Sequence, residues 1–290
     1  MRILILGSTG QLGWEAQRTL ATLGDVIALD YPDVDFTRPS HLARQVIDLR
    51  PNVIYNAVAY TAVDRAESEV EKARLINAVS AGELAEAAAH LGALLVHFST
   101  DYVFDGKLGR PYIETDSPNP LNAYGITKLE GECAVQQVDC THLILRTSCV
   151  YSMRRDSFVY KVLQWSKERS SLRIVSDQIG NPTWARMLAG ISGQLLARGR
   201  NDLDWFRQNR GLYHLAGDGY ASRLEWARAV LENNHQSGGA SIEVLPALTS
   251  DFPTPAERPL FSALDCTRFQ KAFGLKLPPW EKALSLAMQQ

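Results

Sequence analysis

Residues 2–13 read RILILGSTGQLG, and this stretch decides the fold. The apolar run at residues 2–6 predicts a short buried β-strand. Glycines follow at every third position, Gly7, Gly10 and Gly13, and apolar residues recur near helical spacing over residues 11–23. A strand, a glycine-rich turn and a helix in this order are typical of a dinucleotide-binding site.

Such a turn needs glycine because the chain bends sharply, the backbone approaches a pyrophosphate, and the helix packs close to the strand. The first helical turn then offers free N–H groups and a partial positive charge to phosphate oxygens. We therefore expect a nicotinamide dinucleotide to contact this turn. The residues expected to bind it here are Gly7, Gly10, Gln11, Leu12 and Gly13.

Asp30 closes the second predicted strand, residues 26–29. A carboxylate at this position hydrogen-bonds the adenosine ribose 2′-OH and repels a 2′-phosphate, so Asp30 favours NADH over NADPH. A strand-end cap or a solvated carboxylate is the alternative. Asp35 and Phe36 are expected to lie against the adenine, and a buried aromatic residue is the alternative for Phe36.

Strands and helices alternate along the first half of the chain. Further strands are predicted at residues 53–55, 93–98 and 143–146, and helices at residues 41–49, 70–91 and 123–135. This alternation predicts a parallel sheet with right-handed crossovers. The expected fold is therefore α/β, with a Rossmann-type doubly wound parallel sheet that binds the dinucleotide in residues 1–150.

The pattern loosens after residue 150. Helices are predicted at residues 158–169, 187–197, 224–233 and 280–288, strands at residues 213–215 and 242–245, and a loop at Gly238-Gly239. We expect residues 151–290 to form mostly a smaller substrate-binding lobe, from which segments can return to the sheet.

Composition excludes several classes of protein. The 290 residues include 30 Lys+Arg and 32 Asp+Glu, a net charge of −2, so the chain lacks the cationic surplus of nucleic-acid or anionic-membrane binding. No run approaches the ~18 apolar residues that span a bilayer. The four cysteines have no C-x-x-C spacing, which argues against zinc and favours reduced thiols in the cytoplasm.

Tyr124 and Lys128 form a Y-x-x-x-K pair near the start of a predicted helix. Their spacing places both side chains on one helix face. A neighbouring ammonium stabilises a phenolate and lowers the tyrosine pKa toward the working range of an acid–base catalyst. Thr100 follows a predicted strand at the sheet edge where ligands of open parallel sheets bind. Thr100, Tyr124 and Lys128 are therefore the expected catalytic residues.

With these residues the chain resembles the extended short-chain dehydrogenase/reductase superfamily and, within it, the dTDP-4-dehydrorhamnose reductase family. The most specific matches are Thr-Asp-Tyr-Val-Phe-Asp-Gly at residues 100–106 and Pro-Thr-Pro-Ala-Glu-Arg-Pro at residues 253–259. The other matching stretches are residues 7–15, 56–64, 120–125 with Lys128, 146–148 and 177–183.

The resemblance implies hydride transfer from NADH or NADPH to the 4-keto carbon of dTDP-4-dehydro-L-rhamnose, which gives dTDP-L-rhamnose. Tyr124 would donate the proton, while Lys128 would tune the pKa of Tyr124 and bind the nicotinamide ribose. Thr100 would hydrogen-bond the sugar oxygen, with Asp101 beside it. The residues implied to line the cofactor are Ala57, Val58, Ala59 and Tyr102. Arg258 is a candidate for the nucleotide pyrophosphate, because a guanidinium matches phosphate oxygens.

Three positions depart from the family. Cys149 stands where relatives carry a tryptophan that meets the sugar, so the substrate contact there is thinner. Glu15 matches a glutamate with which some members hold magnesium and dimerise, but residues 184–186 offer no partner glutamate. We expect no metal site, and both a monomer and a homodimer are compatible with the sequence. Residues 217–222 replace a threonine-rich family loop.

Two other functions stay open. A sugar-nucleotide dehydratase places an acidic pair after the threonine, whereas here Tyr102 follows Asp101, which argues against dehydration. This argument does not distinguish a reductase from a sugar-nucleotide 4-epimerase. A non-catalytic nucleotide-binding subunit, similar to the regulatory beta subunit of methionine adenosyltransferase, is the alternative outside enzymology. The intact Thr100, Tyr124 and Lys128 set argues against that alternative.

Overall fold

The computed structural model describes residues 1–154, 157–200, 202–236 and 242–289. The predicted loop at Gly238-Gly239 lies outside the described residues. Within the described part of the chain, no helix is both long and apolar enough to cross a membrane.

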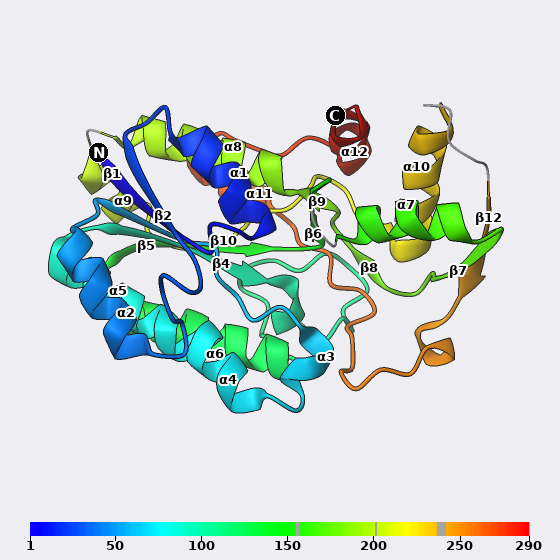
Figure 1. Ribbon diagram of the computed structural model, residues 1–290, viewed down its shortest axis with the longest axis horizontal. Helices are drawn as coiled ribbons and strands as arrows, with labels where there is room; N and C mark the ends of the chain where they lie inside the picture. The colour runs from blue at the N-terminus through cyan, green and yellow to red at the C-terminus, as the bar shows by residue number, and fades with distance from the viewer. Residues whose placement is uncertain (155–156, 201, 237–241, 290) are drawn as a thin grey trace.

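A six-stranded parallel sheet forms the centre of the larger body, and it confirms the predicted doubly wound α/β fold (Figure 1). The strand order is β10-β5-β4-β3-β1-β2, so the order reverses between β1 and β3. Its strands are β1 (Arg2–Leu6), β2 (Asp25–Leu29), β3 (Val53–Asn56), β4 (Leu94–Thr100), β5 (Thr141–Thr147) and β10 (Gly211–His214). Ligands of such sheets bind beyond the carboxyl ends of the strands at this reversal.

Helices cover both faces of the sheet. The helices α1 (Gln11–Leu20) and α8 (Ala185–Arg198) lie together on one face, and α2 (Pro39–Leu49), α5 (Ser80–Leu91) and α6 (Ala123–Gln137) cover the other (Figure 1). The middle strands are apolar on both sides because each face packs against helices; β1 and β4, for example, contribute residues to both cores.

The alanine-rich segment predicted as one helix is interrupted by a π-turn. It consists of α4 (Val70–Arg74), a π-helical turn (Leu75–Val79) and α5. Asn77 lies in this turn and is buried. Its Oδ1 accepts the Tyr60 N–H at 2.8 Å, and its Nδ2 donates to Thr127 Oγ1 at 3.0 Å. The widened turn thus lets Asn77 tie the loop after β3 to α6.

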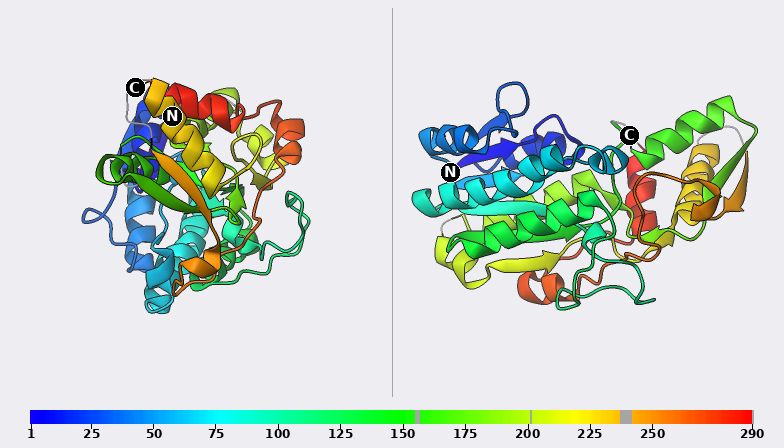
Figure 2. Two further views of the ribbon diagram at one scale, coloured as in Figure 1. Left: turned by 90° about the vertical axis from the view of Figure 1, so that its right-hand side faces the viewer. Right: turned by 90° about the horizontal axis from the view of Figure 1, so that it is seen from below.

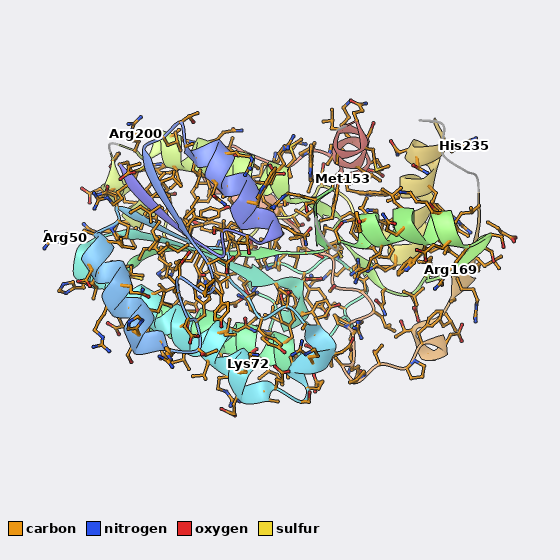
Figure 3. The ribbon with its side chains drawn as sticks, in the orientation of Figure 1. Arg50, Lys72, Met153, Arg169, Arg200 and His235 are labelled. Carbon is orange, nitrogen blue, oxygen red and sulfur yellow. The ribbon has the colours of Figure 1, made fainter. Side chains whose placement is uncertain are left out.

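The second half of the chain forms a smaller lobe at one end of the sheet (Figures 1 and 2). The helices α7 (Phe158–Glu168) and α10 (Arg223–Gln236) pack against the parallel pair β7 (Ser171–Val175) and β12 (Glu243–Ala247). Their core also takes in α12 (Trp280–Met288). Figure 3 shows Arg169 at the outer end of this lobe and Arg50 at the opposite end of the molecule.

Parts of the second half return to the larger body. The strand β10 pairs with β5, α8 packs on α1, and α11 (Thr267–Phe273) contributes Phe269 and Phe273 to the core of the sheet. The sequence did not predict α11, β7 or the short helices α3 (Val63–Ala66) and α9 (Leu203–Gln208). Short two-residue strands connect sheet and lobe: β6 (Val150–Tyr151), β8 (Ile179–Gly180), β9 (Thr183–Trp184) and β11 (Ala221–Ser222).

Candidate active site

The glycine turn between β1 and α1 is closely packed. Gly7 has a φ of +80°, which side chains other than glycine rarely adopt, and a Cβ at Gly13 would lie 2.1 Å from the Gly7 carbonyl oxygen. The turn is held against β2, because the N–H groups of Gly7 and Ser8 both donate to the Leu29 carbonyl. Gly10 caps α1 without a side-chain hydrogen bond. The first N–H groups of the helix are therefore available to an anion.

A cavity of about 870 Å³ lies over the carboxyl ends of β1, β3, β4 and β5. It brings together most of the residues predicted from sequence. Those that line it are Gly7, Gly10, Gln11, Leu12, Asp30, Ala57, Val58, Ala59, Thr100, Asp101, Tyr124, Lys128 and Cys149. Five predicted residues lie outside this wall: Gly13, Asp35, Phe36, Tyr102 and Arg258.

Asp30 lies at the cavity wall and also holds the glycine turn. Its Oδ2 accepts the Thr9 N–H at 2.8 Å and the Thr9 hydroxyl at 2.7 Å, and its Oδ1 accepts the Tyr31 N–H at 2.8 Å. The carboxylate is thus fixed in direction by the backbone beside it. The same fixed carboxylate faces the cavity, where a ribose hydroxyl could bind it.

Phe36 is a core residue and not a wall of the cavity. Its side chain is 7% exposed and packs in the apolar cluster between the sheet and α2. Its carbonyl accepts the Ser80 hydroxyl. Asp35 accepts the N–H and hydroxyl of Thr37, and these hydrogen bonds lower the pKa of its carboxyl. The packing of Phe36 in this structure is therefore that of a buried aromatic residue, the alternative to a contact with the adenine.

Tyr124 lies in the first turn of α6, which Asn122 caps through a 2.8 Å hydrogen bond from the Gly125 N–H. Burial raises the pKa of the Tyr124 hydroxyl, and the hydrogen bond with Thr100 opposes this rise. Asp101 raises the pKa further. The lowered pKa expected for Tyr124 is therefore not seen in this geometry. The hydroxyl is protonated at neutral pH, the form that a proton donor requires.

Lys128 is buried one turn further along α6. Its Nζ donates to the Phe98 carbonyl at 2.6 Å and lies 3.4 Å from His97 Nε2. Burial lowers the pKa of Lys128 to about 8. Burial also lowers the pKa of His97 well below its usual value, and the Lys128 charge adds to this effect, so the imidazole is neutral. Asn56 fixes the ring through its Nδ1 at 3.0 Å.

Asp101 is a buried carboxylate whose partners are hydroxyl groups. Thr100 Oγ1 donates to its Oδ1 at 3.1 Å, while Ser148 and Ser262 donate to its Oδ2 at 2.9 and 2.5 Å. Burial raises the pKa of Asp101, and these hydrogen bonds oppose the rise. Asp101 therefore orients Thr100 and joins β4, the end of β5 and the segment around Ser262.

Tyr102 and Cys149 lie on the lobe side of Tyr124. The Tyr102 ring meets the Tyr124 ring edge to face, with centroids 5.7 Å apart, and burial raises the pKa of Tyr102 to about 12. Cys149 has a φ of +46°, which is uncommon for a residue with a side chain. Burial also raises the pKa of its thiol, so a reactive thiolate is not favoured.

Arg258 does not reach the cavity wall; it lines a neighbouring cleft of about 630 Å³. Its guanidinium donates to Asp64 Oδ2 at 2.8 Å and to Thr254 Oγ1 at 2.5 Å. The Arg258 hydrogen bond lowers the pKa of Asp64. These contacts anchor the Pro-Thr-Pro-Ala-Glu-Arg-Pro segment to α3. Arg258 therefore has a structural role in this segment.

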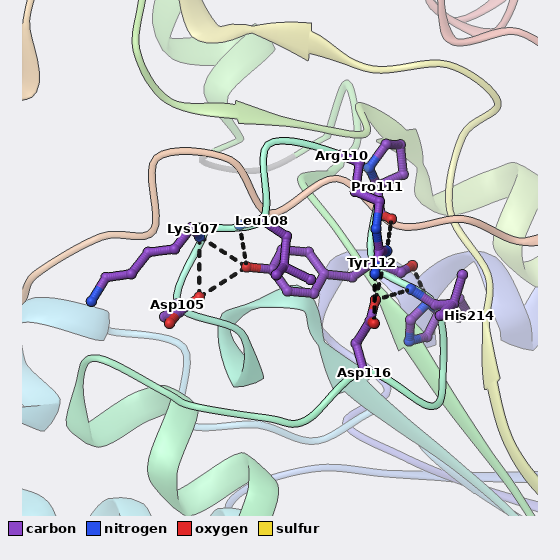
Figure 4. Close-up of polar contacts among 9 residues, drawn as sticks. Asp105, Lys107, Leu108, Arg110, Pro111, Tyr112, Asp116 and His214 are labelled. Carbon is purple, nitrogen blue, oxygen red and sulfur yellow. Dashed lines mark hydrogen bonds and ion pairs between the residues drawn. The ribbon is translucent and has the colours of Figure 1, made fainter.

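The second half of the run at residues 100–106 has a structural role. The Tyr112 hydroxyl donates to Asp105 Oδ1 at 2.9 Å and accepts the Lys107 N–H at 2.9 Å (Figure 4). Arg110 and Asp116 form a bidentate ion pair beside them, with both distances 2.8 Å. Asp105 thus shapes the long loop after Tyr102 and takes no part in the cavity.

Sequence reasoning missed several residues of the cavity. Thr147 ends β5 in register with Thr100, and Ser148 follows it, so the rule that identified Thr100 could have found them. Thr147 is 8% exposed, and its hydroxyl has no hydrogen-bond partner among the described residues. The other wall residues that were missed include Thr9, Thr61, Arg154 and Tyr160. Thr9 and Thr61 lie in stretches that match the family, so their context could have marked them, whereas no motif marks Arg154 or Tyr160.

Glu15 does not offer a free carboxylate to a metal. It is 5% exposed, and its Oε2 accepts from Arg186 Nε at 3.1 Å. Arg186 is the residue that stands where a second glutamate would be needed. Among the described residues, no group of three His, Cys, Asp or Glu side chains is arranged to hold a metal ion.

The whole chain, residues 1–290, matches the family model described as the RmlD substrate binding domain. A dTDP-4-dehydrorhamnose reductase of Escherichia coli strain K12 is 44% identical over 287 residues, covering 97% of this chain and 95% of that protein. One of Burkholderia thailandensis is 41% identical over 293 residues, covering 100% of this chain and 98% of that protein.

Solved structures show the same likeness. The dTDP-4-dehydrorhamnose reductase of Bacillus anthracis, in complex with NADP, superposes with a TM-score of 0.91 at 33% identity, over 99% of this chain and 98% of that one. On the fold, the cavity and these comparisons, the chain belongs to the RmlD substrate binding domain family, together with these dTDP-4-dehydrorhamnose reductases.

Proposed function

We propose that this chain is an NAD(P)H-dependent oxidoreductase that reduces the 4-keto group of dTDP-4-dehydro-L-rhamnose to give dTDP-L-rhamnose. The observation that carries this proposal is one cavity whose wall contains both the glycine turn and the set Thr100, Tyr124 and Lys128. Cofactor-binding and acid–base groups therefore face the same space. The relatives that share the whole chain carry the same activity in their names.

The residues present fit a dinucleotide. A side chain at Gly13 would fill the space that the turn and helix share, and the uncapped start of α1 offers N–H groups to a pyrophosphate. The small residues Ala57 and Ala59, which follow β3, leave room in the cavity wall. When bound there, NAD(P)H supplies a hydride to a carbonyl carbon.

Tyr124 provides the proton. As the carbonyl carbon of the sugar gains a hydride, its oxygen becomes an alkoxide and takes the proton of the Tyr124 hydroxyl. Burial keeps that hydroxyl protonated until the alkoxide forms. In this structure the Thr100 hydroxyl donates its one proton to Asp101, and it turns from Asp101 to the same sugar oxygen when the substrate binds. Two donors then converge on one oxygen, as stabilisation of a developing oxyanion requires.

Lys128, one turn after Tyr124 on α6, stabilises the phenolate of Tyr124. Its buried ammonium favours negative charge on Tyr124 once the proton has left, and its bond to the Phe98 carbonyl fixes its position. The neutral His97 beside it adds no competing charge. We propose that Lys128 also binds the nicotinamide ribose.

The division of labour between the two halves follows from this placement. We propose that residues 1–150 bind the cofactor and that residues 151–290 supply mainly the substrate lobe, with β10, α8 and α11 supporting the sheet. Asp30 favours NADH, although the Bacillus anthracis relative is in complex with NADP. The free thiols among the described residues fit a cytoplasmic protein, which acts as a monomer or a homodimer.

The test is to measure oxidation of NADH and NADPH by the purified protein with dTDP-4-dehydro-L-rhamnose made in situ. We expect dTDP-L-rhamnose as the product, at one equivalent per cofactor oxidised. Turnover of a panel of other nucleotide keto-sugars, but not of this one, would indicate another enzyme of the superfamily. Binding of both cofactors with no oxidation on the whole panel would favour a non-catalytic nucleotide-binding subunit.

A further inference from the structure

A second cleft opens from the catalytic cavity toward the lobe. It has a volume of about 630 Å³, and Gln11, Cys149 and Val150 belong to the walls of both spaces. Its far wall includes the aromatic ring of Trp226 and the guanidinium of Arg223. A substrate bound at Tyr124 can therefore extend into this cleft.

Arg223 is the first residue of α10, and its position is well defined. Its backbone N–H donates to the Gln178 carbonyl at 3.0 Å. Its guanidinium lies 5.1 Å from the ring centroid of Phe158 and 5.3 Å from that of Trp226. The half-buried cation is thus held between aromatic rings.

Arg223 differs from two of the other three arginines at the cleft in its partners, and from the third, Arg169, in being half-buried where Arg169 is exposed. Arg258 is paired with Asp64 at 2.8 Å and Arg173 with Asp251 at 2.7 Å. In the described ranges of the chain, Arg223 forms no ion pair with a carboxylate. The charge of Asp101 acts on Arg223, but the Asp101 carboxylate forms no ion pair with it and accepts from Thr100, Ser148 and Ser262. An anionic ligand that paired with the guanidinium would offset the cost of withdrawing it from water.

Tyr102 lies near both Arg223 and Tyr124. With Arg223 it lines a small cavity, and its ring packs edge to face on Tyr124, with centroids 5.7 Å apart. In a nucleotide sugar the diphosphate is attached to carbon 1, across the pyranose ring from the keto group on carbon 4. A hexose whose carbon 4 lies at Tyr124 therefore directs its diphosphate toward the cleft.

We propose that Arg223 binds the diphosphate of the nucleotide-sugar substrate and positions the sugar ring against Tyr124. This inference rests on the proposed function. A guanidinium suits the role because its planar fork can hold two phosphate oxygens at once. The substrate is then held at both ends, with carbon 4 at Thr100 and Tyr124 and the diphosphate at Arg223.

Calorimetric titration of the full-length protein with dTDP tests the assignment directly, with thymidine measured by displacement. Arg223→Gln should weaken dTDP binding about tenfold or more, as expected for a lost charge-assisted hydrogen bond. Binding of thymidine and of NAD(P)H should be unchanged. Arg223→Lys keeps the charge and should lose less affinity. The matched control is Arg228→Gln, an exposed arginine on the same helix, which should bind dTDP like the wild type.

Kinetics test the positioning role. Arg223→Gln should raise KM for the keto-sugar and also lower kcat, because the sugar ring is no longer held against Tyr124. A rise in KM with unchanged kcat would overturn the positioning role. Equal losses for dTDP and thymidine, or no loss for dTDP, would overturn the assignment of Arg223. A wild-type protein that binds dTDP but reduces no keto-sugar would contradict the proposed function alone.

Discussion

The Nζ of Lys128 donates to the carbonyl oxygen of Phe98 at 2.6 Å. This bond joins helix α6 to strand β4 directly beneath the catalytic cavity. It fixes the ammonium in a buried place, one helical turn from Tyr124, and burial lowers the pKa of Lys128 to about 8. The lysine that supports the phenol thus titrates close to the pH at which an enzyme works, whereas the phenol does not.

The first prediction concerns this titration. The Lys128 charge is present below its pKa of about 8 and is lost as pH rises through that value, while Tyr124 stays protonated. The value of kcat/KM, which reports the free enzyme, should therefore fall above about pH 8. An arginine at this position stays charged at all these pH values. The activity of Lys128→Arg, although weaker than that of the wild type, should therefore show no such fall up to pH 9, about one unit above the pKa of Lys128. If kcat/KM of Lys128→Arg falls above about pH 8 as in the wild type, this fall is not due to the titration of Lys128.

The second prediction concerns cofactor choice. Asp30→Asn keeps an oxygen that can accept from Thr9 but removes the charge that opposes a 2′-phosphate. The ratio of NADPH to NADH affinity should rise about tenfold, a change of ~1.4 kcal/mol. Fluorescence titration with both cofactors measures it. The control is Asp33→Asn, an exposed carboxylate three residues on, which should leave the ratio as it was.

The third prediction concerns stability. Arg146 and Glu132 form a buried ion pair at 2.6 Å, and the Ser99 hydroxyl donates to the same carboxylate. Glu132→Gln leaves Arg146 buried without its counter-charge and should lower the free energy of unfolding by about 3 kcal/mol. Removal of the exposed partner in the Arg210–Asp139 pair, by Arg210→Gln, should cost less than about 1 kcal/mol. Denaturant unfolding compares the two, and equal costs would sink the argument.

The fourth prediction concerns magnesium. Because the Glu15 carboxylate is bound to Arg186, a divalent cation would have to displace a guanidinium. Treatment with EDTA should leave both kcat and the molar mass in solution unchanged. Loss of activity on chelation that added magnesium restores would show that the protein binds a functional metal ion, and would contradict this prediction.

Much of the fold follows from local patterns. The strand β1 and the helix α12 have the predicted ends, because an apolar run stopped by glycine and an amphipathic helix after prolines are strong local signals. The strand β7 was missed because its partner β12 lies some seventy residues away in sequence, and only the pairing makes it a strand. The π-turn at Asn77 depends on hydrogen bonds to Tyr60 and Thr127, which a helical pattern does not reveal.

The candidate site divides in the same way. Thr100, Tyr124 and Lys128 could be predicted because each is placed by the end of a strand or by helical spacing. Phe36 is expected from the sequence to lie against the adenine, whereas the structure buries it in the apolar cluster that also contains residues of α2, which is the alternative given for it. Arg223 carries no sequence signal, since its position at the cleft results from the fold of the distant lobe.

The central claim is that Tyr124 protonates the sugar oxygen during hydride transfer, and one comparison tests it most directly. Oxidation of NADPH and NADH with dTDP-4-dehydro-L-rhamnose should be measured for the wild type beside Tyr124→Phe. We predict dTDP-L-rhamnose from the wild type, and for the variant a drop in kcat on the order of 10²-fold or more with cofactor binding intact. Full activity of Tyr124→Phe would contradict the account.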